Sequence, residues 1–385
     1  MSNRPTFASR PTSMACLAGV LLAALGVGGC SSSPFSPGRQ LSIEERRKEF
    51  PVQYDVYSKI GYRLDWVGFP TITGSLPVQS FQGYDDMAVA LEAGSFLSIL
   101  EPNTGAQRCA DQLSNALTKF VGFVRDGNRI YVASEGEIFT VDTQTCNLFS
   151  RQKTARIVAT EPVLFNNLLI FGSGVGEVFA HYAAGGVGGV KAWGFLGRGA
   201  FEHKPVVIGS AIGVVSQTGQ VLFLDAQSGS LLGRNDIYDG LATNPVTDGH
   251  LMFVASLDQS LYAFTPDGAS TVWRFRTGAP LRVQPTATAD RVYCAIPEQG
   301  LTAFESGTGH VLWSTKGFQG TVVGTNHGRL VAWDGTDAAL IDAARGDIIE
   351  RVTLKGAAML RPDQFDDGKL YVVSKSGVVA RFLVK

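Results

Sequence analysis

TAFESGTGHVLW, residues 302–313, is the stretch that decides the fold, because variants of it recur along the chain at regular spacing. The other copies are SILEPNTGAQRC (98–109), FTVDTQTCNLFS (139–150), AAGGVGGVKAW (183–193), LFLDAQSGSLLG (222–233), YAFTPDGASTVW (262–273) and LIDAARGDIIE (340–350). Most of them read as an alternating apolar strand, an acidic or polar residue, a small turn and a second strand. The turn recurs about every 40 residues, a period typical of β-propellers.

The repeat predicts an all-β chain, an eight-bladed β-propeller of four-stranded antiparallel blades. Seven turns occur, at Gly105, Cys146, Gly189, Gly229, Gly268, Gly309 and Gly346. After the last turn the chain supplies only three more strands. We expect residues 60–66 to provide the missing fourth strand by pairing with the C-terminal blade, which closes the ring without an open edge.

Prolines predict where the innermost strand of a blade begins, and two blades depart from the repeat. A proline has no N–H to donate, so it is tolerated at the start of a strand. We therefore expect the innermost strands to begin at Pro77, Pro162, Pro205, Pro245 and Pro285. The second blade lacks this proline and has Ser150 in the place of tryptophan. The seventh has Glu350 there, and its outer strand is expected to fray.

Composition restricts the class of protein. The chain has 385 residues with 33 basic and 34 acidic side chains, a net charge of −1, so no field gathers nucleic acid and no nucleic-acid partner is expected. A hydrophobic share of 45% excludes global disorder. The 45 glycines favour short strands and tight turns over helices.

Residues 1–29 have the pattern of a lipoprotein signal peptide. Arg4 and Arg10 precede an apolar run over residues 15–29, which is too short for a relaxed membrane span of about 20 residues. Small residues precede Cys30, as in a bacterial lipobox, so lipidation of Cys30 is expected. The alternative is an ordinary secretory peptide with an incidental cysteine. Ser31, in place of aspartate, favours the outer membrane as the destination of the lipid-anchored protein.

Residues 30–53 are predicted to form a tether between the lipid and a propeller over residues 54–385. The segment 31–41 is rich in serine and proline and is expected to be flexible. Ser42 and Glu45 have capping-box spacing, which predicts a short charged helix over residues 43–49. Because this helix has few apolar positions, we expect a solvated spacer.

Four tryptophans occupy one place in the repeat. Trp193, Trp273 and Trp313 follow the turn by four or five residues, as Trp66 follows a glycine near the N-terminus. An indole there can stack on the turn of a neighbouring blade while its N–H reaches a carbonyl. The turn glycines Gly189, Gly229, Gly268 and Gly309 allow the close approach. The alternative is that these aromatic residues line a ligand cleft.

A protein interface has three candidate residues. Trp333 falls outside the register of the other tryptophans and is expected to be exposed. Arg274 and Arg276 belong to an outer strand, and tryptophan and arginine are favoured at interfaces. Ordinary alternation of a strand surface is the alternative explanation for all three.

The repeat resembles the tryptophan-docking, PQQ-type repeat of quinoprotein-like propellers over residues 60–385. With the lipobox, the tether and eight compact repeats, the chain is similar to the propeller lipoproteins of outer-membrane β-barrel assembly. The resemblance implies a non-catalytic scaffold, lipid-anchored on the periplasmic face of the outer membrane, that binds the barrel-bearing subunit of that machinery. It supplies no partner-binding motif that can be placed residue by residue.

The resemblance also gives meaning to the cysteines. In the resembled propellers the tryptophan of one blade packs against the turn of the next. Cys109 stands in the tryptophan place and Cys146 in the next turn, so a Cys109–Cys146 disulfide is predicted, which an exported compartment permits. The alternative is two unrelated small core residues. Cys294 is expected to be a buried free thiol.

No catalytic, metal-binding or cofactor-binding residues are assigned. The five histidines lie far apart, and no HExxH, GxSxG, Walker A or EF-hand pattern occurs. A quinone-dependent dehydrogenase, the enzyme alternative within the resembled superfamily, would carry adjacent cysteines and longer loops. Two further alternatives are an envelope propeller that binds another protein complex or a cell-wall polymer, and a small-molecule sensor that uses the axial pocket.

Overall fold

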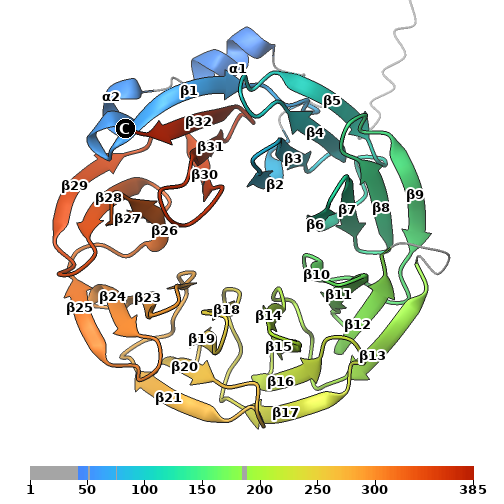
Figure 1. Ribbon diagram of the computed structural model, residues 1–385, viewed down its shortest axis with the longest axis vertical. Coiled ribbons are helices and arrows are strands. Elements are labelled where there is room, and N and C mark those ends of the chain that lie inside the picture. The colour runs from blue at the N-terminus through green and yellow to red at the C-terminus, as the bar shows by residue number, and fades with distance from the viewer. Residues whose placement is uncertain (1–41, 51–52, 75, 184–188) are drawn as a thin grey trace, which may run out of the picture. The chain divides into compact units, whose positions relative to one another are not determined.

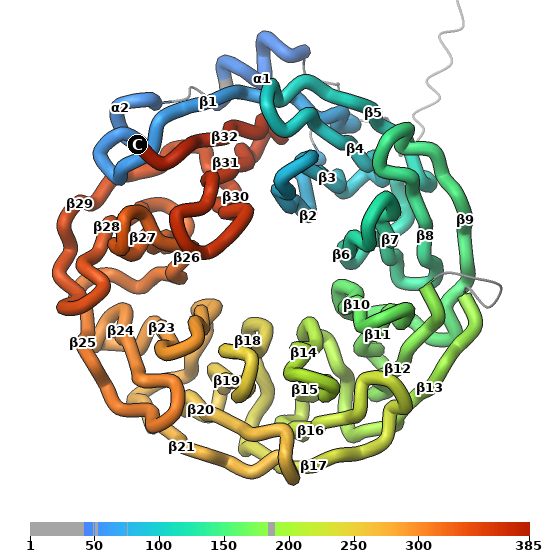
Figure 2. Tube along the Cα trace, in the orientation of Figure 1, coloured from blue at the N-terminus to red at the C-terminus, as the bar shows by residue number. Residues whose placement is uncertain are grey.

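The computed structural model describes residues 42–50, 53–74, 76–183 and 189–385. Within these residues, eight antiparallel sheets of four strands each are arranged in a ring (Figure 1). The sequence prediction of an eight-bladed β-propeller is therefore confirmed. Figure 2 shows that β2, β6, β10, β14, β18, β22, β26 and β30 face the centre of the ring, and that β5, β9, β13, β17, β21, β25, β29 and β1 form its outer edge.

Blades 1 to 4 follow one another along the chain, each from its innermost to its outermost strand. Their strands are β2 (Val78–Gly83), β3 (Ala88–Glu92), β4 (Phe96–Leu100) and β5 (Gln107–Gln112); β6 (Phe120–Asp126), β7 (Arg129–Ser134), β8 (Glu137–Asp142) and β9 (Leu148–Lys153); β10 (Val163–Phe165), β11 (Leu168–Gly172), β12 (Glu177–Tyr182) and β13 (Lys191–Leu196); β14 (Val206–Ile208), β15 (Ala211–Val215), β16 (Gln220–Asp225) and β17 (Leu231–Asp236).

Blades 5 to 8 repeat this order, except that the outermost strand of blade 8 comes from the N-terminal end. Their strands are β18 (Val246–Thr247), β19 (Met252–Ser256), β20 (Ser260–Phe264) and β21 (Thr271–Arg276); β22 (Thr286–Ala287), β23 (Arg291–Ile296), β24 (Gly300–Glu305) and β25 (Val311–Thr315); β26 (Thr321–Asn326), β27 (Arg329–Trp333), β28 (Asp337–Asp342) and β29 (Ile348–Thr353); β30 (Ala357–Pro362), β31 (Leu370–Ser374), β32 (Val379–Val384) and β1 (Tyr62–Gly68).

The hydrophobic core lies between neighbouring blades. All five residues of β11 and of β19 are buried, because both faces of a blade pack against the next blades. Outer strands such as β21 alternate between exposed and half-buried residues instead. The strand pattern of the sequence therefore changes from continuous apolar runs in the middle of a blade to alternation at its edge.

Turn chemistry explains the acidic residue of the repeat. Asp142, Asp225 and Asp342 end the third strands of their blades, and one carboxylate oxygen of each accepts hydrogen bonds from backbone N–H groups in the following turn. These bonds lower the pKa of Asp142 and Asp342, and the Ser228 hydroxyl, followed by the backbone bond, lowers that of Asp225. In five blades the innermost strand begins at the residue after the expected proline, in β2, β10, β14, β18 and β22.

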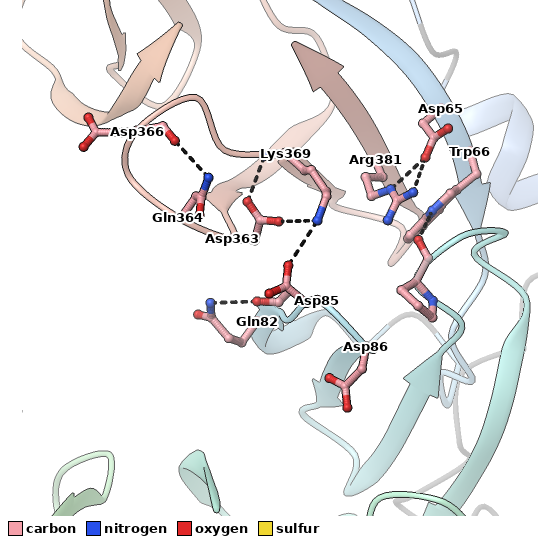
Figure 3. A network of polar contacts seen from close by, with 12 residues as sticks. Asp65, Trp66, Gln82, Asp85, Asp86, Asp363, Gln364, Asp366, Lys369 and Arg381 are labelled. Carbon is pink, nitrogen blue, oxygen red and sulfur yellow. Dashed lines mark hydrogen bonds and ion pairs between the residues drawn. The ribbon is translucent and has the colours of Figure 1, made fainter. Parts of the chain in front are cut away.

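The ring closes through strand β1. It pairs antiparallel with β32, from Tyr62 opposite Val384 to Gly68 opposite Val379, which confirms the predicted closure. Beside this ladder the Arg381 guanidinium, only 7% exposed, binds the Asp65 carboxylate, with Nε 2.8 Å from Oδ2 (Figure 3). Two chain segments that are 316 residues apart in sequence are thus held together.

Two short helices precede β1. The first of them is fastened to the propeller, so it is not the solvated spacer that we expected. Helix α1 (Ile43–Glu49) has the predicted capping box between Ser42 and Glu45. Its Arg46 is buried and donates to the carbonyls of Pro70, Ser376 and Gly377 at 3.0, 3.1 and 2.7 Å. The spacer prediction failed because a charged side chain, not an apolar face, fastens this helix.

Helix α2 (Tyr54–Lys59) adds an aromatic contact. The Tyr57 ring stacks on Phe382 of β32 with 4.0 Å between ring centroids. Burial alone lowers the pKa of Arg46 to about 10 and raises that of Tyr57 beyond its usual range. In the described part of the chain, neither helix is long and apolar enough to cross a membrane.

The outer strand of blade 7 is not frayed, contrary to expectation. Strand β29 pairs with β28 along its length, from Asp337 opposite Thr353 to Ile341 opposite Ile348. The Asp337 carboxylate holds its end by accepting from Arg351 Nε at 2.9 Å and from the Thr353 hydroxyl at 2.8 Å. Backbone pairing and these bonds hold β29 on its own blade without a tryptophan.

Candidate partner-docking face

The connections of each antiparallel blade alternate between the two faces of the ring. We call connector face the one that carries the turns between second and third strands and the links between blades, and turn face the opposite one. Hydrogen bonds join links to turns on the connector face: the Phe201 N–H donates to the Ser173 carbonyl at 3.0 Å, and the Leu257 N–H to that of Gly240 at 2.9 Å. The connector face is therefore a surface of interlocked loops.

We call apolar arc five large apolar side chains of the connector face that are each more than half exposed. They are Leu117, Ile157, Val175, Leu196 and Tyr238, exposed by 76, 58, 61, 74 and 95% respectively. Leu117, Ile157 and Tyr238 lie in links between blades, Val175 in a turn, and Leu196 at the end of β13. On this face, the links and turns between residues 277 and 378 expose no large apolar side chain. Exposed apolar side chains confined to one arc of one face make this arc a candidate interaction surface.

Ion pairs surround the apolar arc. Beside Leu196, Arg198 binds the Asp236 carboxylate. Closer to Val175, Glu177 is paired with Arg156 at 2.7 Å and with Lys191. Burial alone would raise the pKa of Glu177, but the two cations outweigh it and hold the pKa below its ordinary value. The arc thus has a polar rim of both signs, the usual surroundings of an apolar interface centre.

Arg274 and Arg276, two sequence candidates, lie beside the arc. With Tyr238 they line a cavity of about 600 Å³ between blades 4 and 5. The Arg274 guanidinium lies 4.9 Å from the centroid of the Tyr262 ring, and its Nε donates to Ser260 Oγ at 3.0 Å. These contacts fix the position of Arg274, although both arginines are exposed.

Asp258 forms the floor of this cavity. Its side chain is 3% exposed and accepts from the Tyr262 hydroxyl at 2.6 Å and from the Tyr238 N–H at 3.3 Å. Burial, reinforced by Asp258, raises the pKa of Tyr262 to about 12. The bond to the Tyr238 N–H holds the backbone of that residue, while its ring remains exposed.

Trp333, the third candidate for the interface, does not belong to this face. It is half-buried at the end of β27 and lines a cavity at the axis of the ring, not an exposed surface. Its exposure was predicted wrongly because side chains of blade 8 cover it, including Leu360. The structure brings Arg274 and Arg276 together and leaves Trp333 elsewhere.

The other four tryptophans all lie at junctions between blades. A Cβ atom at Gly105, Gly229, Gly309 or Gly346 would overlap the indole of Trp66, Trp193, Trp273 or Trp313, respectively. The four indole N–H groups donate to the carbonyls of Pro102, Ala226, Ser306 and Ala343 at 2.8, 3.1, 2.7 and 3.0 Å. Each tryptophan therefore stacks on the turn of the next blade and satisfies its N–H there.

Gly189 and Gly268 receive no tryptophan, in contrast to the expectation. Gly189 faces the side chain of Gln152, because blade 2 has no tryptophan to offer. Gly268 forms a parallel backbone bridge with Gly233, which stands in the tryptophan place of blade 4. The glycine pair lets two backbones approach directly where an indole is absent.

The cysteines divide into three cases. The sulfur atoms of Cys109 and Cys146 are bonded between blades 1 and 2, with Cα atoms 5.7 Å apart. Cys146 has a φ of 59°, a left-handed conformation that glycine adopts in the other turns. Cys294 is free and buried in β23, and burial raises its pKa to about 12. Cys30 lies outside the described residues.

The apolar arc was not found from the sequence. Four of its members stand in links and turns, and Leu196 is the last residue of outer strand β13. The repeat pattern describes the strand register and not which of these side chains stay exposed. One signal was present: Leu196 and Tyr238 are large apolar residues beside Gly197 and Asp239, in segments rich in turn-forming residues. An apolar side chain in such a link has little access to the core.

The fold defines the chain as an eight-bladed propeller of PQQ-type repeats with four tryptophan-docked junctions. A family model described as outer membrane protein assembly factor BamB matches residues 217–361. A Burkholderia pseudomallei protein with that same name is 26% identical over 116 residues, which span 30% of this chain and 30% of the relative. The chain is a BamB-like propeller.

Solved structures share the fold. The crystal structure of BamB from Moraxella catarrhalis has a TM-score of 0.63 and 18% identity, covering 83% of this chain and 98% of that one. A computationally designed protein, Ika8, has a TM-score of 0.69 and 11% identity, covering 84% of this chain and 99% of its own. At these identities the likeness concerns the fold alone.

Proposed function

We propose that this chain is a non-catalytic, lipid-anchored scaffold of the bacterial envelope that acts in outer-membrane protein assembly by binding a protein partner on its connector face. The apolar arc carries the proposal. It supplies exposed Leu196 and Tyr238 next to a cavity lined by arginines, and tyrosine and arginine are common among residues that dominate binding energy.

The partner class follows from the similarity. The names of the matching family model and of the Burkholderia relative place those proteins in outer-membrane protein assembly. By analogy, we propose the barrel-bearing subunit of the assembly machinery as the partner of this chain. Cys30, with its lipobox pattern, would anchor the protein at the periplasmic face of the outer membrane, and acyl chains provide such an anchor without a spanning helix.

Affinity capture of the lipidated protein from gently solubilised membranes tests the proposal. We expect recovery of a barrel-assembly subunit with the unmodified chain, and a loss of about tenfold or more with Leu196→Glu or Tyr238→Glu, because each places a charge in an apolar contact. Leu312→Glu is the matched control, since Leu312 is 46% exposed on the outer strand β25, away from the arc.

Two results would contradict the proposal. Equal recovery with the Leu196 and Leu312 variants would show that the arc is not the docking surface. Recovery of a polysaccharide or an unrelated complex, with no barrel-assembly subunit, would assign the protein to another envelope process. Circular dichroism of each variant establishes that the propeller is folded.

A further inference from the structure

The axis of the ring contains a cavity that the docking function does not use. Two parts, of about 430 and 530 Å³, share Asn244, Met359 and Arg361 in their walls. The walls come from innermost strands and the links before them, on opposite sides of the ring, whose innermost strands converge on the axis in Figure 2. The cavity therefore lies at the axis.

Hydrogen bonds from blade to blade line part of this cavity. Lys204 pairs with Glu161 at 2.8 Å, and its N–H donates to Asn244 Oδ1 at 2.9 Å. Asn244 and Gln284 exchange two bonds, of 3.1 and 3.0 Å, and the Thr321 hydroxyl donates to the Gln284 carbonyl at 2.9 Å. Lys204 is thus neutralised, and the wall is held in a fixed arrangement.

Two arginines in the same cavity have no such compensation. Arg282 lies in the link before β22, and Arg361 in β30. Both are exposed, and within the described residues neither guanidinium has a hydrogen-bond or ion-pair partner. The carboxylate that shares their cavity, Asp334, accepts from the N–H groups of Thr336 and Asp337 at 2.9 and 2.7 Å and lies 3.7 Å from Arg351.

We propose that the axial cavity binds a small ligand through a carboxylate or phosphate group held between Arg282 and Arg361. Guanidinium forks match the geometry of such oxyanions, and a concave wall concentrates their field. Trp333 lines the same cavity, and its enclosed indole N–H has no acceptor among the described residues. An anion there would supply the counter-charge that both guanidinium groups lack.

Titration calorimetry with citrate and with inorganic phosphate at constant ionic strength tests this site on the intact folded chain. We expect saturable binding by at least one probe, weakened about tenfold in both Arg282→Gln and Arg361→Gln because each loses a charge-assisted bond. Arg234→Gln, at an exposed arginine of outer strand β17, is the matched control and should change affinity less than about twofold.

Tryptophan fluorescence locates the binding. The signal change caused by the probe should disappear in Trp333→Phe while the heat of binding persists, because the other four tryptophans lie at blade junctions. Three results would overturn the site: no saturable heat with either probe, an effect of only one of the two axial arginines, or an equal effect of Arg234→Gln. The last result would mean that the anions only screen the surface charge. Thermal melts show that the variants remain folded.

Discussion

Blade 6 and blade 8 contain the same four-stranded sheet but complete it differently. In blade 6, the outer strand β25 follows β24 through a tight turn at Gly309. In blade 8, the outer strand β1 comes from the other end of the chain and has no hairpin to hold it. The Asp65–Arg381 pair and the stack of Tyr57 on Phe382 hold that region together instead. Lost chain continuity is therefore offset by side-chain contacts.

The junctions that precede blade 6 and follow blade 8 share the tryptophan contact but differ in their ion pairs. Between blades 5 and 6, Trp273 stacks on Gly309 and donates to the Ser306 carbonyl. Between blades 8 and 1, Trp66 makes the equivalent contact, and an ion-paired bridge is added: Lys369 Nζ lies 3.0 Å from Asp363 and 3.2 Å from Asp85 (Figure 3). Asp85 is 97% exposed, so this bridge adds little, and the buried Arg381 and Trp66 matter most.

Trp66→Ala removes the docked tryptophan of blade 8, whose outer strand comes from the other end of the chain. Trp273→Ala removes that of blade 5, whose outer strand follows through a hairpin. Each should lower the free energy of unfolding by about 3 to 5 kcal/mol, the usual cost of removing a well-packed tryptophan. Only Trp66→Ala should also detach a strand, because β1 is not covalently linked to its neighbour by a turn. Urea unfolding measures the first effect, and hydrogen exchange of residues 62–68 measures the second.

Hydrogen exchange of the individual strands shows whether the closing strand β1 is the least stable part of the ring. Rapid exchange in β1 with protected β31 in Trp66→Ala, and uniform protection of β20 and β21 in Trp273→Ala, are expected. If β1 stays as protected as in the unmodified chain, the side-chain contacts alone are sufficient to hold the closing strand.

The junction between blades 1 and 2 sharpens the comparison, since it replaces a docked indole with a covalent bond. We expect reduction of Cys109–Cys146, or the double change to alanine, to lower stability by about 3 to 4 kcal/mol, the chain-entropy value for a loop of 37 residues. Cys294→Ala is the control and should keep its response to reductant. Alkylation of denatured, unreduced protein should label Cys294 and leave Cys109 and Cys146 unlabelled; labelled thiols at these two positions would contradict the bond.

The sequence could reveal the ring because the features that build it recur. Trp273 and Gly309 share a register with Trp66 and Gly105, so one copy of the contact predicts the others. The closure followed from counting strands, since the last blade was one strand short. Repetition makes these predictions robust to local irregularity.

Features that occur once were not predictable in the same way. Arg46 fastens α1 through three backbone carbonyls from two distant segments, and no pattern of side chains encodes carbonyl positions. Trp333 was expected at the surface, but its burial depends on blade 8, which folds over it. The apolar arc depends on link conformations, which the repeat does not specify.

The smallest expected effect isolates the docking contact from backbone strain. Gly309 and Gly268 occupy the same turn position with φ of 71 and 65°, but only Gly309 carries an indole. Gly268→Ala should cost about 1 kcal/mol for the left-handed backbone, because its new methyl group meets only Ser270 Oγ, at 3.5 Å. Gly309→Ala should cost about 3 kcal/mol, since the methyl group also displaces Trp273. Equal costs in urea unfolding would mean that displacing the indole costs nothing, so that its docking on the turn does not stabilise the junction.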